Sequence, residues 1–282
     1  MLSKPFSRAP MGDVNVDLIM DMMLWSVKTY GPCVKPQVPN LLKKNNLLPS
    51  WDDNDETPVF QWAMREFERI LIQTNMTRWR VQLLPDAVLA GQYAITPHNT
   101  LRANEAQNAP LPSYHIDKMG RPIFYYDPRE CHRPGYLLGH IVPKLAQLKL
   151  FAAEAPREFQ KENLPLLLDV VTCHMGQGLA NIALIKPQDT RPKAGFSLKR
   201  PPCDRAKERL LFATVLALSS RRLSPEQIIA HYGPILSKSH RKAIWPICKT
   251  IEKQSEFIKL LRVMTDNRFA ERSLITPKRK TA

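Results

Sequence analysis

Two kinds of segment are missing from this chain. It contains no uncharged apolar run of the ~18 residues or more that a membrane-spanning helix needs. Its first residues, MLSKPFSRAP, lack the apolar centre of a secretory signal. The five cysteines lie far apart and form no C-x-x-C pair, a pattern typical of reduced thiols inside the cell. We therefore expect a soluble, cytoplasmic protein that is at most peripheral to membranes.

Catalytic and cofactor motifs are missing as well. The chain has no G-x-S-x-G elbow and no glycine-rich phosphate loop, and its cysteine and histidine spacings match no usual zinc site. We expect no catalytic residue, no metal and no cofactor, which points away from an enzyme. Asp169, inside an apolar run, is either a catalytic acid at a strand end or, as we favour, a buried carboxylate bonded to the backbone.

Acidic residues are scarce in the last third of the chain. Residues 186–282 contain 22 Lys+Arg against 8 Asp+Glu, whereas residues 1–185 contain 19 against 18. The last third therefore carries an excess of 14 positive charges out of a formal net charge of +15. An excess of one sign is typical of proteins with a polyanionic partner, either nucleic acid or an anionic membrane surface. Charge alone does not choose between them.

What is present is a series of short elements separated by many of the 25 prolines. Apolar residues at helical spacing and capping signals predict helices. In the second of these, five residues share the core-facing side: Phe60, Ala63, Phe67, Ile70 and Leu71. The predicted helices cover residues 17–30, 57–74, 135–155, 204–222 and 224–233, followed by one or two around Pro246.

Two segments predict strands. PIFYY, residues 122–126, follows a turn at DKMG and ends at Asp127-Pro128. LPLLLDVVTC, residues 164–173, is a near-continuous apolar run of the kind buried on both faces of a parallel sheet. A strand, a helix and a second strand in this order predict a βαβ unit. The predicted fold class is therefore α/β, a small sheet with flanking helices and mainly helical N-terminal and C-terminal regions.

Composition divides the chain into four regions. We expect an N-terminal helix and loops over residues 1–56, and a helical segment plus an α/β core over residues 57–185. A basic, proline-rich connector covers residues 186–203, and a basic helical region covers residues 204–282. In the last region Asp204 is a candidate cap, and SPEQIIAHYG has the pattern of a capping box with a glycine stop.

Several of these motifs together resemble a known family. TRWR followed by LLPDAVLAG, then DKMGRPIFYY, a helical segment and LPLLLDVV, is similar to the first half of a Sec14-like (CRAL-TRIO) lipid-binding domain. Trp79-Arg80, the D-x-x-G-R-P turn at residues 117–122 and Asp169 occupy the motif positions. The resemblance covers residues 58–172 and, more briefly, 228–245. After Cys173 the chain departs from the order of the family.

The resemblance implies a cavity for acyl chains and a basic exterior that docks on anionic membranes. The candidate lipid-pocket residues are Phe124, Tyr126, Leu166 and Leu168. The candidate anionic-surface residues are Arg221, Arg222, Lys238, Arg241 and Lys242. The first hypothesis is therefore an intracellular protein for lipid binding or lipid transport.

The alternative hypothesis is a basic regulator or adaptor that binds nucleic acid through residues 199–282. The segment LSPEQIIAHYGPILSKSHRKAIWPI has the rhythm of a helix–turn–helix. An acidic protein partner is a third interpretation. Strands that open at Pro122 and Leu164 and lie side by side above a hollow favour lipid. A packed helical core with a basic face favours nucleic acid or protein.

Overall fold

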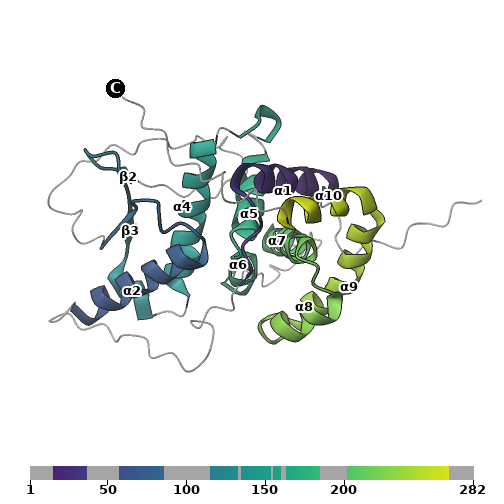
Figure 1. The fold of residues 1–282 in the computed structure, drawn as a ribbon. Coiled ribbons are helices and arrows are strands. Elements are labelled where there is room, and N and C mark those ends of the chain that lie inside the picture. Colours follow the sequence, from purple (N-terminus) through teal and green to yellow (C-terminus); the bar gives the residue numbers. More distant parts are fainter. Residues whose placement is uncertain are drawn as a thin grey trace, which may run out of the picture.

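The computed structural model describes residues 15–36, 57–85, 115–132, 135–153, 155–159, 163–184 and 202–266. These residues are mostly helical and include a small three-stranded mixed sheet. The sheet lies on one side with α2 and α4, while α8, α9 and α10 lie at the opposite end (Figure 1). In chain order the elements are α1 (Val16–Tyr30), α2 (Thr57–Gln73), β1 (Gln82–Pro85), β2 (His115–Ile116), β3 (Pro122–Tyr126), η3 (Pro128–His132), α4 (Tyr136–Ala153), η4 (Arg157–Phe159), α5 (Leu164–His174), α6 (Gly178–Leu184), α7 (Pro202–Ser220), α8 (Pro225–Tyr232), η6 (Gly233–Ile235), α9 (Lys238–Lys253) and α10 (Ser255–Asp266).

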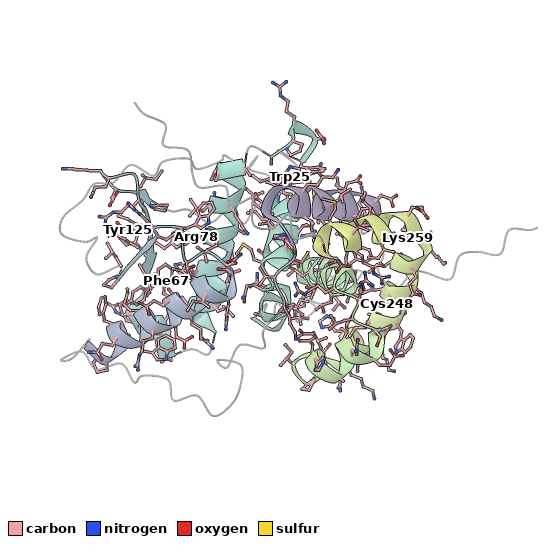
Figure 2. The ribbon with its side chains drawn as sticks, viewed as in Figure 1. Trp25, Phe67, Arg78, Tyr125, Cys248 and Lys259 are labelled. Atoms are coloured by element: carbon pink, nitrogen blue, oxygen red, sulfur yellow. The ribbon has the colours of Figure 1, made fainter. Side chains whose placement is uncertain are left out.

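The sheet has the strand order β1-β3-β2. The strand predicted at PIFYY is confirmed as β3, which lies at the centre, pairs in parallel with β1 and pairs in antiparallel fashion with β2. Helices α2 and α4 pack against this sheet. The rings of Phe67 on α2 and Phe124 on β3 meet edge to face with centroids 6.5 Å apart. Phe67 lies between α2 and the strands in Figure 2.

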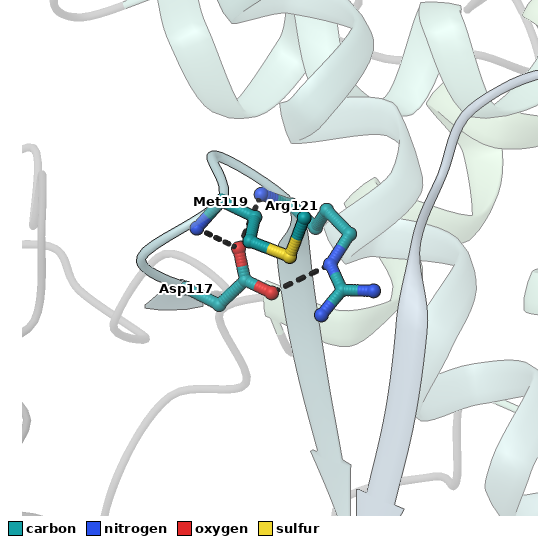
Figure 3. A network of polar contacts seen from close by, with 3 residues as sticks. All are labelled: Asp117, Met119 and Arg121. Atoms are coloured by element: carbon teal, nitrogen blue, oxygen red, sulfur yellow. Dashed lines mark hydrogen bonds and ion pairs between the residues drawn. The ribbon is translucent and has the colours of Figure 1, made fainter.

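The turn predicted at DKMG is confirmed as the hairpin between β2 and β3. Gly120 has a φ of +75°, which favours glycine at this position. One carboxylate oxygen of Asp117 accepts hydrogen bonds from the backbone N–H groups of Met119 (2.8 Å) and Arg121 (2.7 Å), and the other pairs with Arg121 Nε at 2.6 Å (Figure 3). These bonds, the one from the Arg121 backbone first, lower the pKa of the Asp117 carboxyl. The Asp117 carboxylate is therefore paired within the turn itself.

The strand predicted at residues 164–173 is wrong, because this segment forms the helix α5. No βαβ unit therefore joins it to β3. A short apolar run by itself does not distinguish a buried strand from a buried helix. Pro165 lies in the first turn of α5. Backbone N–H groups there make no hydrogen bond within the helix, so a proline without an N–H is tolerated. Since α5 contacts α1, α4, α6 and α7, apolar residues are required almost all round it.

Helix α7 lies at the centre of the helical part (Figure 1). It contacts α1, α5, α6, α9 and α10, and every residue from 210 to 220 is buried. The helix begins at Pro202, so the predicted cap Asp204 lies inside it. Buried residues from α1 through α10 form one continuous cluster. The helical segments on either side of the predicted connector, residues 186–203, therefore share one hydrophobic core.

Other helices follow their local signals closely. α1, α2, α4 and α8 form where helices are predicted, and the capping box with Ser224 and Gln227 is present at α8. On α2 one expectation is wrong: Phe60 is 42 % exposed, and Val59 is buried in its place. The chain remains helical through Pro246, so α9 is a single helix. None of the helices in the described ranges combines the length and the apolarity needed to cross a bilayer.

Candidate nucleic-acid interface

The four lipid-pocket candidates do not come together on a sheet. Phe124 and Tyr126 lie on β3, whereas Leu166 and Leu168 lie on α5. Phe124 is 0 % and Tyr126 1 % exposed. A cavity wide enough for a water molecule would leave exposed area on a ring beside it, so these two rings are covered by the core of the protein itself. Their burial is explained by packing.

The five anionic-surface candidates fall into two groups. Arg221 and Arg222 lie in the turn between α7 and α8. Arg221 Nη1 donates a 2.6 Å hydrogen bond to the carbonyl oxygen of Cys33, which ties this turn to the segment after α1. Arg222, with a φ of +62°, pairs with Asp266 at the end of α10. Both guanidinium groups therefore have structural partners.

The second group lies on α9. Lys238, Arg241 and Lys242 are exposed, and four further exposed side chains of α9 lie on the same side of the helix, within about one third of its circumference at 3.6 residues per turn. We call this surface the basic face of α9. It consists of the five cations Lys238, Arg241, Lys242, Lys249 and Lys253, together with Trp245 and one carboxylate, Glu252.

The basic face of α9 is long enough to follow a polyanion. Lys238 and Lys253 are separated by about 22 Å along the axis at a rise of about 1.5 Å per residue. Within the described part of the chain, the five cations of this face have no ion-pair partner. Glu252 is the one acidic residue of the helix and lies exposed on this same face, about one turn after Lys249. Five cations against one carboxylate leave the face with an excess of four positive charges.

The opposite side of α9 fixes the orientation of the helix. Ile244, Ile247, Cys248 and Ile251 are buried there, and α9 packs against α7, α8 and α10. Figure 2 shows Cys248 within the packed region between these helices. Because the apolar side is used by the core, it is not available to a membrane or to another protein.

The beginning of α9 is held by two local contacts. Ser237 is the N-cap and accepts a 3.2 Å hydrogen bond from the backbone N–H of His240. The aliphatic stem of Arg241 packs over Gly233 in the preceding turn, where a Cβ atom would lie 3.3 Å from Arg241 Cδ. A side chain at this glycine would displace the Arg241 stem by a few tenths of an ångström.

The remaining polar clusters are explained by structure. The carboxylate of Asp169 on α5 accepts a hydrogen bond from Arg209 on α7 at 3.3 Å; burial raises the pKa of this carboxyl to about 6 and Arg209 opposes the rise. The hydrogen-bond partner of the Asp169 carboxylate is thus the side chain of Arg209 and not, as we expected, a backbone group. Elsewhere, Tyr30 donates a hydrogen bond to the carbonyl oxygen of Lys149 at 3.0 Å, and His174 Nε2 donates to that of Gly31 at 2.8 Å. These bonds join α1 to α4 and α5.

Among the described residues, no group of three or more His, Cys, Asp or Glu side chains is close enough together to bind a metal ion. Four cysteines there, Cys33, Cys131, Cys173 and Cys248, are buried free thiols. Burial raises the pKa of each of them, which makes a poor nucleophile or metal ligand of a thiol.

Trp245 and Lys253 also lie on the basic face but were not among the residues predicted from the sequence. The signal for them is the spacing of positions 238, 242, 245, 249 and 253, which recur every three or four residues. This spacing indicates one face only if the helix continues through Pro246. If Pro246 is taken as a possible helix boundary, the residues before and after it are not assigned to one face of a single helix.

Comparison of the chain with protein-family models, with curated proteins and with solved structures found no match.

Proposed function

We propose that this protein binds nucleic acid through the basic face of α9. The observation that carries the proposal is the run of five exposed cations without ion-pair partners, against one carboxylate, on one side of a helix whose other side is buried. Lysine and arginine side chains in such a row neutralise phosphates and release bound counterions. These five cations belong to the region, residues 186–282, that carries an excess of 14 positive charges.

The lipid hypothesis has less support from the geometry. It depended on neighbouring strands that open at Pro122 and Leu164 above a hollow, and the second of these segments is a helix. A helix that docks on a bilayer presents several apolar residues beside its cations. On the outer side of α9, Trp245 is the one large apolar side chain that is exposed. Exposed Leu260 and Val263 belong to the next helix, α10.

The test measures binding of fluorescently labelled oligonucleotides of about 20 nucleotides between about 50 and 200 mM salt. We expect affinity to fall steeply as salt rises. The variant Lys238→Gln/Lys242→Gln/Lys249→Gln should weaken binding by roughly tenfold or more at low salt. It should also reduce the slope of log affinity against log salt by about 2, because each contact to a single-stranded phosphate contributes about 0.7.

The matched control removes the same charge elsewhere. Lys28, Lys118 and Arg157 are exposed basic residues outside α9, and the triple change of these residues to Gln lowers the net charge equally. If both triple variants weaken binding to the same extent, the net charge and not the basic face is responsible. A flat salt response of the unmodified protein would remove the proposal. Binding to anionic vesicles without oligonucleotide binding would favour the lipid hypothesis.

A further inference from the structure

Trp245 has an unusual environment for a tryptophan. Most tryptophans are largely buried, but this one is 44 % exposed and lies at the middle of the basic face of α9. In the described part of the chain its indole makes no hydrogen bond and no ring contact. Trp25, by contrast, meets Tyr30 and Phe159 edge to face, with centroids 5.5 and 6.2 Å away.

Core packing does not explain the position of Trp245. The core side of α9 is occupied by Ile244, Ile247 and Ile251, which are at most 1 % exposed. Trp245 lies on the other side of the helix. Covering the exposed part of this ring with a flat apolar group would remove apolar area from water, which is favourable. The question is therefore which ligand offers both a negative charge and a flat apolar surface.

The neighbours of Trp245 along the helix are cations. Lys242 precedes it by three residues and Lys249 follows it by four, so they lie about 4.5 and 6 Å away along the axis. Both are exposed. An aromatic ring between two lysines, about one turn away on each side, matches a chain that alternates flat bases with phosphates. Base stacking on an aromatic side chain combined with lysine–phosphate contacts is the usual chemistry of single-strand binding.

A duplex does not offer the same contact. Its bases are stacked on one another, so that their flat faces are covered, and only phosphates and base edges are presented to a helix. Lysines of the basic face would bind a duplex through phosphates alone, and Trp245 would have no base to stack on. An unpaired base has a free face and can cover the indole.

Resting on the proposed function, we infer that the basic face of α9 binds single-stranded nucleic acid with an unpaired base stacked on Trp245. The lysines on either side contact the phosphates that flank this base. The stack does not depend on base identity, because every base has a flat face. The site therefore selects single strands over duplexes and not one sequence over another.

The test compares oligo(dT), oligo(U) and a duplex of the same length, each of about 20 nucleotides. Trp245→Ala should weaken binding to both single strands by roughly tenfold to a hundredfold, the range expected for loss of one base stack. Binding to the duplex should change by less than about twofold, because phosphate contacts remain. The salt slope should stay the same, since no charge is removed.

Two further variants separate stacking from a general effect. Trp245→Tyr should retain most of the single-strand affinity, because tyrosine also stacks on bases. Phe60→Ala is the matched control: Phe60 is 42 % exposed on α2, far from α9 in the chain. Phe60→Ala should change neither the affinity for single strands nor the affinity for the duplex. Circular dichroism and thermal unfolding of each variant establish that it is folded.

Fluorescence gives an independent readout. The chain has five tryptophans, and stacking of a base on Trp245 should quench part of their emission. Trp245→Phe should abolish this quenching on addition of oligo(dT), while the other four tryptophans still emit. A duplex should cause little quenching of the unmodified protein.

The outcomes distinguish the inference from the proposed function. If Trp245→Ala leaves single-strand affinity unchanged, or weakens single strand and duplex equally, the single-strand inference is overturned and nucleic-acid binding stands. If the unmodified protein binds none of the three oligonucleotides at low salt, both are overturned. A selective loss of single-strand affinity with an unchanged salt slope supports both.

Discussion

Lys149 provides the most direct test of the packed helical core. It lies on α4 and is 7 % exposed, with its ammonium nitrogen 4.7 Å from the ring centre of Tyr30. Among the described residues no carboxylate forms an ion pair with it. Burial lowers the pKa of Lys149 from 10.5 to about 8, with Cys33 opposing the change. The folded protein therefore carries a desolvated positive charge at neutral pH.

The sign of the pH dependence follows from this lowered pKa. Below about pH 8 the lysine is charged in both the folded and the unfolded chain, and burial of the charge lowers the free energy of unfolding by its full amount, about 3 kcal/mol. Between about pH 8 and 10.5 the folded state loses its proton first, so this destabilisation is relieved as the pH rises. From about pH 7 to 9.5 the relief amounts to about 2 kcal/mol.

The assay is urea unfolding, followed by circular dichroism, of the unmodified protein and of Lys149→Met. Met keeps the apolar length of the side chain without its charge, so the variant should be the more stable protein at about pH 7. Its advantage should shrink by about 2 kcal/mol at about pH 9.5. Taking the difference between the two proteins cancels the titration of the buried cysteines, which are common to both.

The control is Lys28→Met, which removes an exposed lysine of α1. Its stability difference from the unmodified protein should be the same at both pH values. Parallel pH profiles for the unmodified protein and Lys149→Met would show that the Lys149 ammonium is solvated, and the described packing around α4 would then be incorrect.

Three further predictions concern the core. Gly178→Ala should destabilise the protein by about 1 to 3 kcal/mol in urea unfolding, since a Cβ atom there would lie 2.1 Å from Thr214 Oγ1; an unchanged midpoint would contradict the close approach of α6 to α7. Phe124→Ala should lower the free energy of unfolding by about 3 to 5 kcal/mol in the same assay. A decrease below about 1 kcal/mol, close to that of exposed Phe60→Ala, would mean that β3 is not buried. Burial lowers the pKa of His174 from 6.5 to about 3, so stability that is present above about pH 6.5 should be lost as the pH falls toward 3. Between about pH 7 and 4.5, the unmodified protein should lose about 2 to 3 kcal/mol of stability relative to His174→Gln. A constant difference between the two proteins would refute the burial of this histidine.

Local signals in the sequence predicted most of the helices and the hairpin. A capping box needs only Ser224 and Gln227 three residues apart, and both side chains make their bonds within one turn. Gly120 and Asp117 form the β-turn by contacts no more than four residues apart. Such features are predictable because every interacting partner is close in the sequence.

The identity of α5 was not predictable in this way. LPLLLDVVTC is apolar enough for a strand or for a helix, and the choice depends on which elements surround it. Two of its neighbours, α1 and α7, come from more distant regions of the chain. The resemblance to a lipid-binding domain depended on treating this segment as a strand, so the same ambiguity affected the functional hypothesis.

The candidate site was likewise predictable from the sequence only in part. Charge counting alone located the positive excess in residues 186–282, because net charge requires no knowledge of structure. It did not separate Arg221 and Arg222, which have structural partners, from the exposed cations of α9. Those partners, Cys33 and Asp266, are 188 and 44 residues away in the chain.

The sequence by itself determined the composition of this protein, its local caps and turns, and the region that bears its positive charge. Only the tertiary structure decided which side of α9 is buried and that Trp245 lies among lysines in solvent. The physical reason is that burial is a property of contacts between distant segments. The same apolar or basic residue serves the core, a turn or a ligand according to the elements that pack beside it.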